Sequence, residues 1–289
     1  MSQICGLKDL KRKEMNPMKT STYGVGLIIN YVINKGCKKL YLGLGGSSTH
    51  DMGTGIFMAL GGGLLDINSL PISKGGGGLL ECEKINFVNL NPKIRSCKII
   101  LAVDVDNPLL GKNGAAEIYS PQKGATPKMV KDLEIGSRKF AALVEKSTKK
   151  KNINIKGGGS AGGTSAGLYG LVNAEIENGF NILEKLVGFE SYIKSSDLVI
   201  SGEGHLDNQS KHGKLINKIG ILTKKNNKPL ICISGKVSLN EKEYNSLGIS
   251  KAWASSPLNY PLQKSIENAY MLLKNKAEVA IKIYLNQKQ

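Results

Sequence analysis

Residues 39–55 read K-L-Y-L-G-L-G-G-S-S-T-H-D-M-G-T-G, an apolar run that passes directly into glycines and small polar residues. The apolar part predicts a strand over residues 39–44, and the side chains of Phe57, Met58 and Leu60 predict a helix after the loop. A strand, a glycine-rich turn and a helix in succession are typical of α/β folds. Such a turn exposes backbone N–H groups at a helix N-terminus, which suits it to bind an anion.

This loop fits neither of two common nucleotide-binding motifs. The G-x-G-x-x-G order of a dinucleotide-binding loop fails at Ser48, and no G-K-[ST] closes the turn as it does in a P-loop. The glycines are therefore compatible with a tight structural turn as well as with an anion site.

Apolar runs and helical periodicities alternate along the rest of the chain. This alternation predicts parallel strands covered by helices, the α/β class. Thr126 and Pro127 look like an N-cap followed by proline in the first helical turn. Further strands are expected at residues 99–103, 197–201 and 230–234, and helices at residues 21–35, 126–147, 212–224 and 262–283.

Three carboxylates follow predicted strands within polar loops. Asp104 begins D-V-D-N-P at residues 104–108, and Glu203 and Asp207 lie in S-G-E-G-H-L-D at residues 201–207. Ligands of open α/β sheets bind at the carboxyl ends of strands, so these acids could hold Mg²⁺ or activate a hydroxyl. Taken alone, each acid also fits a turn or a helix cap.

Two other segments are candidate phosphate sites. G-G-G-S-A-G-G at residues 157–163 leads into an apolar helix and offers a second set of backbone N–H groups. Lys123 precedes the helix that begins near Thr126 and could meet a phosphate as a point charge. In a chain this rich in lysine, a solvated surface side chain is the alternative for Lys123.

Composition narrows the class of protein. The 289 residues carry 40 basic and 23 acidic side chains, a formal charge of +17, but nearly all the basic residues are lysine, and nucleic-acid contacts favour arginine. The five cysteines are widely spaced and are expected to be free thiols in a reducing compartment. No apolar run approaches the roughly 20 residues that span a bilayer. We expect a cytoplasmic protein that binds neither nucleic acid nor membrane, with a basic nucleic-acid binder as the weaker alternative.

Five segments, taken in order, resemble the bacterial glycerate kinases of the first type. They read G-L-G-G-S-S-T-H-D-M-G-T-G, D-V-D-N-P-L-L-G-K-N-G-A-A, P-Q-K-G-A-T-P, G-G-G-S-A-G-G and I-S-G-E-G-H-L-D-N-Q-S-K-H-G-K, and they extend over nearly the whole chain. The resemblance implies a two-domain α/β kinase that transfers the terminal phosphoryl group of MgATP to D-glycerate. The expected product is 2-phosphoglycerate, with 3-phosphoglycerate as the alternative.

The same resemblance implies an architecture and a set of site residues. Residues 1–20 would be a remnant of a flavodoxin-like domain, residues 21–205 a Rossmann-like domain, and residues 206–289 the C-terminal half of the flavodoxin-like domain. Catalysis is assigned to Asp207, Glu203 and Asp104, with Asp104 and Glu203 also expected to bind the metal. Substrate or phosphate binding is assigned to Gly45, Gly46, Ser47, Asp51, Lys123, Gly158, Gly162 and Lys214.

The chain departs from the family pattern in a few places. His50 stands where the family usually has Asn, and His205 stands where Arg is common. Family members begin with a further segment of roughly 90 residues, whose A-P-D-S-x-K and D-G-G-E-G motifs do not occur here. We therefore expect a truncated or split kinase completed by a separately encoded N-terminal half. The alternative is an inactive, nucleotide-binding remnant.

Overall fold

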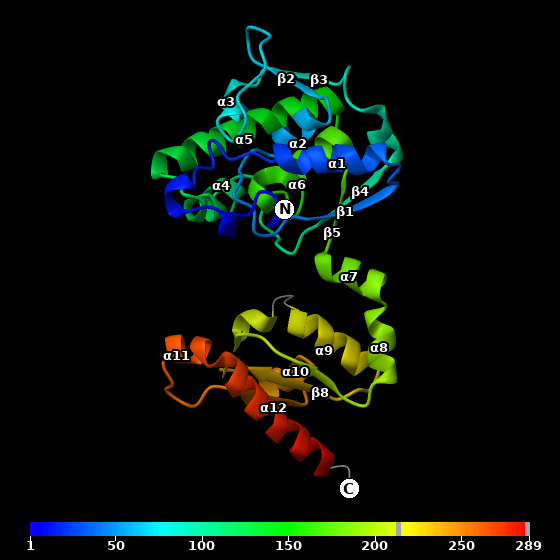
Figure 1. Ribbon diagram of the computed structural model, residues 1–289, viewed down its shortest axis with the longest axis vertical. Coiled ribbons are helices and arrows are strands. Elements are labelled where there is room, and N and C mark those ends of the chain that lie inside the picture. The colour runs from blue at the N-terminus through cyan, green and yellow to red at the C-terminus, as the bar shows by residue number, and fades with distance from the viewer. Residues whose placement is uncertain (212–214, 287–289) are drawn as a thin grey trace. The chain divides into compact units, whose positions relative to one another are not determined.

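The computed structural model describes residues 1–211 and 215–286. The chain divides into two compact units, Met1–Ile182 and Leu183–Gln289, and Figure 1 shows both helices and strands in each. Each unit contains a three-stranded sheet in which every pair of neighbouring strands is parallel. The α/β class predicted from the sequence is confirmed.

The sheet of the first unit has the order β1-β4-β5. Its strands are β1 (Lys39–Gly43), β4 (Lys98–Ala102) and β5 (Glu175–Glu177). The middle of β4 is buried at Ile99, Ile100 and Leu101, as expected for a strand covered on both faces. The sequence predicted β1 and β4 but not β5, since β5 has one apolar residue between two glutamates.

Two apolar clusters hold the helices of the first unit around this sheet. One joins Val25 and Ile29 to Leu42 and Leu101 of the strands, and the other is built around Phe140 and its neighbours. The elements that surround the sheet are η1 (Leu7–Asp9), η2 (Arg12–Glu14), α1 (Tyr23–Asn34), α2 (Thr54–Ala59), β2 (Gly63–Leu65), α3 (Gly78–Glu81), β3 (Lys84–Asn86), η3 (Pro92–Ser96), α4 (Ala115–Tyr119), η4 (Pro121–Lys123), α5 (Pro127–Thr148) and α6 (Ser160–Val172).

Helix α5 begins as its sequence predicts. The hydroxyl of Thr126 accepts a hydrogen bond from the backbone N–H of Met129, and Pro127 occupies the first turn, where its missing N–H costs nothing. The helix ends at Thr148, one residue beyond the expected end, because Lys149 takes a left-handed conformation.

Residues 1–20 belong to the first compact unit, Met1–Ile182. The amino group of Met1 donates to the carbonyl oxygen of Gly43 at 2.7 Å. Backbone hydrogen bonds then run from Leu7 to Gly46 and from Ser48 to Cys5. The N-terminal segment therefore pairs with the beginning of the glycine loop that follows β1.

The second unit is built on the sheet order β10-β8-β6. Every residue of its central strand is buried, and Ala280 packs against Ile231 and Ile233 on one face. Its elements are α8 (Phe189–Ser195), β6 (Val199–Ser201), β7 (His205–Leu206), η5 (Asn208–Lys211), α9 (Leu215–Lys225), β8 (Leu230–Ser234), β9 (Lys236–Val237), α10 (Glu241–Ser246), β10 (Lys251–Ala254), α11 (Leu262–Glu267) and α12 (Ala269–Asn286).

Several predicted boundaries differ from the structure. The expected helix over residues 262–283 is two helices, α11 and α12, because Asn268 interrupts them. The division between the two units falls within α7 (Gly179–Val187), well before the predicted boundary at residue 205. The five cysteines are free, as predicted. None of the described helices is both long and apolar enough to cross a membrane.

Candidate functional site

Three of the predicted loops meet at the carboxyl ends of β1 and β4. The backbone N–H of Met52 donates to the carbonyl of Gly162 at 3.1 Å, which joins the loop after β1 to the second glycine segment. The N–H of Gly159 donates to the carbonyl of Asn107 at 3.0 Å, which joins that segment to the loop after β4. Segments that are far apart in the sequence thus form one continuous surface at the sheet edge where α/β proteins bind ligands.

The glycine loop after β1 keeps part of its backbone open. Gly45 and Gly46 are exposed, and a Cβ built on Gly45 would meet no atom within 4 Å. Gly46 has φ +69°, a left-handed conformation that glycine adopts without strain. Ser47 is nearly buried, with 5% of its surface exposed. The loop therefore presents accessible backbone at Gly45 and Gly46 above a buried hydroxyl.

Lys123 lies beneath this loop and is 3% exposed. Its Nζ donates to Ser47 Oγ at 3.1 Å and to the carbonyl oxygen of Thr49 at 2.7 Å. Burial disfavours the charged amine and lowers its pKa to about 8, against the opposing influence of Asp51 and Cys5. The alternative of a solvated surface lysine is wrong, because the side chain is built into the loop.

Asp51 is fully buried and holds the starts of two helices. Its Oδ2 accepts from the N–H and the hydroxyl of Thr22, at 2.8 and 3.0 Å, before α1. It also accepts from the N–H groups of Gly53 and Gly55 at the start of α2, at 3.1 and 3.4 Å. Burial outweighs these hydrogen bonds and raises the pKa of the carboxyl. Asp51 is thus oriented toward the protein interior, where it positions the loop, and not toward the open space at Gly45.

The second glycine segment packs tightly against the first. Gly162 has φ +63°, and a Cβ there would come within 2.3 Å of the carbonyl oxygen of Thr49. Gly158 is also buried, and a Cβ on it would lie 2.9 Å from the carbonyl oxygen of Ile155. These glycines allow close approach between protein segments.

His50 is buried between the glycine loop and α5. Its Nε2 lies 3.0 Å from the hydroxyl of Ser137, and its Nδ1 has no hydrogen-bond partner among the described residues. Burial, with a smaller contribution from the charge of Lys123, lowers the pKa of the imidazole to about 3. His50 is therefore neutral at physiological pH.

Asp104 projects from the end of β4 and is exposed. Its Oδ1 accepts from Asn178 Nδ2 and from the backbone N–H of Gly179, each at 3.1 Å. These contacts cap the start of α7, which agrees with the capping alternative for this residue. A Cβ at residue 179 would lie 2.7 Å from Asp104 Oδ2, so the glycine admits the carboxylate.

The hydroxyl of Ser210 links the carboxylate of Glu203 to the backbone of Asp207 in the second unit. Ser210 Oγ donates to Glu203 Oε1 at 2.5 Å and accepts from the backbone N–H of Asp207 at 3.2 Å. Asp207 Oδ1 also accepts from the N–H of Gln209 at 2.9 Å. Glu203 and Asp207 lie in one loop, and the convergence of their carboxylates on one cation or one hydroxyl stays a prediction. Lys214 lies outside the described residues.

A preformed metal centre is not part of this arrangement. Within residues 1–211 and 215–286, no group of three or more His, Cys, Asp or Glu side chains could hold a metal ion. Kinases commonly bind Mg²⁺ through one or two carboxylates together with substrate phosphates and water. The exposed carboxylate of Asp104 could bind Mg²⁺ in this way, together with substrate phosphates and water.

The profile of the Glycerate kinase family matches residues 1–285. The chain belongs to the glycerate kinase family. A glycerate kinase from Halalkalibacterium halodurans is 35% identical over 96% of this chain and 73% of its own length. A glycerate 2-kinase from Escherichia coli K12 is 33% identical over 93% of this chain and 71% of its own length.

A solved structure supports the assignment to this family. The crystal structure of a candidate glycerate kinase 2 from Salmonella typhimurium LT2 matches with a TM-score of 0.81 and 32% identity. The match extends over 99% of this chain and 75% of the Salmonella typhimurium chain. The protein is therefore a kinase of the glycerate kinase family with the matching fold. The expected separately encoded N-terminal half finds no support in these comparisons, since the relatives match almost all of this chain.

Two residues that shape this site, Thr22 and Ser137, were not predicted from the sequence. Thr22 and Ser137 contact Asp51 and His50 from helices that lie far away in the sequence. No motif marks either residue, because Thr22 acts through its own N–H and hydroxyl and Ser137 through its hydroxyl alone. Thr22 directly precedes α1, which begins at Tyr23, whereas the predicted helix already began at residue 21, so the sequence did not single it out.

Proposed function

We propose that this kinase transfers the terminal phosphoryl group of MgATP to a hydroxyl of D-glycerate. The expected product is 2-phosphoglycerate, and 3-phosphoglycerate is the alternative. The observation that carries the proposal is the family match over residues 1–285, which includes all five polar segments. The relatives named glycerate kinase and glycerate 2-kinase support the choice of glycerate as acceptor. The free cysteines agree with a cytoplasmic location.

In the first unit we assign anion binding to the glycine loop after β1. The backbone of Gly45 and Gly46 is accessible, and a Cβ at residue 45 would point into open space. Lys123 fixes the hydroxyl of Ser47 and adds positive charge under the loop. Phosphoryl transfer depends mostly on positioning and on charge stabilisation, so a rigid, electropositive loop is the part that this reaction needs.

Asp51 and Gly162 contact that loop from the protein side, and Gly158 lets the second glycine segment pack closely against Ile155 and Ala166. Asp51 ties the loop to the starts of α1 and α2, and Gly162 lets the second glycine segment lie against Thr49. We therefore propose that these three residues are positioning residues, and that the ligand contacts belong to Gly45, Gly46 and Ser47. Lys214 is still expected to supply charge to a phosphate.

The acids supply proton and metal chemistry in this proposal. Asp207 accepts the proton of the glycerate hydroxyl while the hydroxyl oxygen bonds to the γ-phosphorus. The bond from that phosphorus to the bridging oxygen breaks, and ADP leaves. Asp104 in the first unit and Glu203 in the second are each proposed as a carboxylate ligand of Mg²⁺, which would neutralise charge on the phosphates. Glu203 already accepts a hydrogen bond from Ser210, which orients its carboxylate.

The test is ADP formation by the purified chain with MgATP and D-glycerate. We expect turnover that requires D-glycerate and magnesium, with L-glycerate as the matched control acceptor. Phosphorus NMR of the product distinguishes 2-phosphoglycerate from 3-phosphoglycerate. Binding of MgATP without glycerate-dependent ADP formation would instead support the inactive, nucleotide-binding alternative.

A further inference from the structure

A second concavity lies at the amino ends of the strands in the sheet of the first unit. It encloses about 640 Å³, within the range of small-molecule sites. Its rim includes Lys98 and Glu175, the first residues of β4 and β5, and Lys38, which directly precedes β1. The candidate active site lies at the carboxyl ends of the same strands. A five-residue strand separates its two ends by roughly 15 Å, so the two places are distinct.

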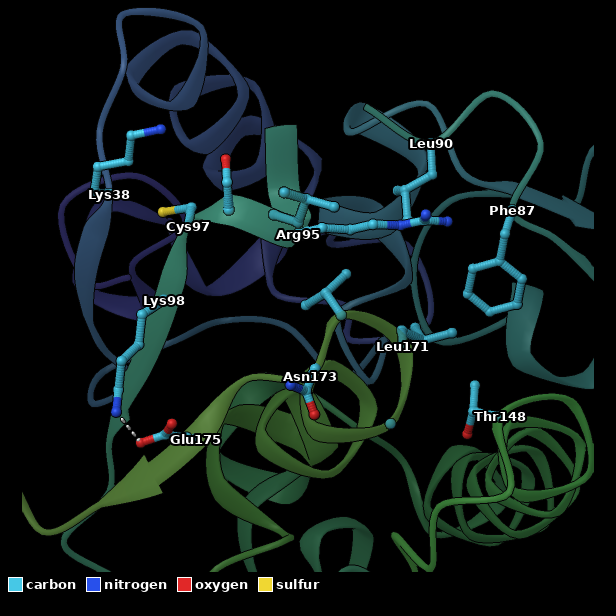
Figure 2. Close-up of a pocket in the computed structure, with 14 residues that line it drawn as sticks. Lys38, Phe87, Leu90, Arg95, Cys97, Lys98, Thr148, Leu171, Asn173 and Glu175 are labelled. Carbon is cyan, nitrogen blue, oxygen red and sulfur yellow. Dashed lines mark ion pairs between the residues drawn. The ribbon is translucent and has the colours of Figure 1, made fainter. Parts of the chain in front are cut away.

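The walls of this pocket are apolar and belong to the packed core. Ile94 and Leu171 are 4% and 5% exposed, and each is a member of one of the two core clusters. Phe87 and Leu90 pack against the same clusters and keep part of their surface toward the pocket. Figure 2 shows Phe87, Leu90 and Leu171 around one side of the opening. A ligand placed here would meet fixed hydrocarbon surface.

The rim of the pocket carries uncompensated positive charge. Lys98 and Glu175 form an ion pair at 2.8 Å, so they neutralise each other, as the dashed line in Figure 2 marks. Arg95 and Lys38 also line the pocket, and neither forms an ion pair within the described part of the chain. A guanidinium binds carboxylate or phosphate through two parallel hydrogen bonds.

We propose that this pocket binds a small amphipathic anion, an organic phosphate or carboxylate with an apolar body. The apolar body lies against Leu171, Leu90 and Phe87, the anionic group pairs with the guanidinium of Arg95 beside them, and Lys38, on the other side of the opening, adds positive charge to the rim. Neither half of the lining is sufficient by itself, because exposed cations hold a free anion weakly and an open apolar wall gives no orientation. The proposal is independent of the phosphoryl-transfer reaction.

Phenyl phosphate is the probe, measured by isothermal titration with saturating MgADP and D-glycerate present to occupy the proposed active site. We expect it to bind at least tenfold more tightly than inorganic phosphate or benzyl alcohol, which carry only one half of its chemistry. Benzoate, tested in parallel, distinguishes a carboxylate ligand from a phosphate ligand. Loss of binding when MgADP and glycerate are added would overturn the proposal, because the probe would then occupy the active site.

Two variants locate the anionic group. Arg95→Gln and Lys38→Gln should each weaken phenyl phosphate binding at least fivefold, since each removes one rim cation that has no ion-pair partner among the described residues. Lys128→Gln removes one exposed charge from the start of α5, outside the pocket lining, and should change binding by less than twofold. Equal weakening in all three variants would indicate a general effect of net charge and would sink the assignment, as would unchanged binding in both rim variants.

Discussion

The amine of Lys123 lies 3.1 Å from the hydroxyl oxygen of Ser47, across 76 positions of sequence. Both residues are almost completely buried, so this hydrogen bond forms in a medium that screens charge poorly. The contact fixes the hydroxyl under the exposed backbone of Gly45 and Gly46. A change in the protonation of Lys123 would therefore alter the hydrogen bonds that hold the loop.

Lys123→Met should change how stability depends on pH. The pKa of Lys123 is about 8 in the folded protein and the ordinary pKa of lysine is 10.5, so the unfolded chain binds more protons between these values. The free energy of unfolding of the parent should therefore rise, relative to the variant, by about 2 to 3 kcal/mol from pH 7 to pH 10. Urea unfolding at the two pH values measures this difference. Lys128→Met is the control, and a Lys123→Met curve that stays parallel to the parent would contradict the burial of a charged amine.

His50→Asn should reduce sensitivity to acid. The imidazole has a pKa of about 3 in the folded protein and an ordinary pKa of 6.5, so between these values only the unfolded chain takes up its proton. The parent should lose about 2 kcal/mol more than the variant between pH 7 and pH 5. Chemical unfolding at these two pH values tests this, and His50→Gln should behave in the same way. Equal losses in parent and variants would show that His50 is protonated in the fold.

Gly162→Ala and Gly45→Ala separate packing from ligand binding. Residue 162 has a positive φ, and its new Cβ would overlap the Thr49 carbonyl, so Gly162→Ala should cost at least about 2 kcal/mol of stability. Gly45→Ala places its Cβ in open space, and should change stability by less than about 0.5 kcal/mol. The same Gly45→Ala protein should show a KM for ATP raised at least fivefold. An unchanged KM would remove Gly45 from the anion site.

Asp207→Asn tests whether this acid acts in the chemistry. Asparagine can still accept the hydrogen bond from Gln209, so the melting temperature should stay close to that of the parent. Loss of a general base lowers turnover by typically 10²- to 10⁴-fold. The assay is ADP formation at saturating D-glycerate, with Asp106→Asn, an exposed partner of Lys156, as the matched control. A rate within about threefold of the parent would transfer the role to Glu203 or Asp104.

The sequence was most informative where one short segment determines its own structure. Thr126 and Pro127 predicted the start of α5, and the apolar run before Asp104 predicted β4. It was least informative where a polar element depends on its neighbour. Strand β5 has the sequence Glu175-Ile176-Glu177, and it is a strand because β4 provides its hydrogen-bond partners.

The same contrast between predictable and unpredictable features applies to the candidate site. The loop sequences predicted ligand-binding segments at the carboxyl ends of β1 and β4, and the structure brings these two loops together with residues 157–163. The loop sequences did not predict which side chains are oriented toward protein. The carboxylate of Asp51 could serve a ligand or a helix start, and only the positions of Thr22 and Gly53 decide between the two.

The central position of β4 constrains the order in which the first unit can assemble during synthesis. Lys98 pairs with Lys39, and Ile100 pairs with Glu175, so both neighbours of β4 are remote in the chain. Pairing of remote segments is slow, because the entropy of closing the intervening loops is lost before the contacts form. We therefore expect the edge of β4 that pairs with β5 to stay unpaired during synthesis until residues 175–177 have left the ribosome. An unpaired strand edge of this kind exposes a nascent chain to aggregation and to capture by chaperones.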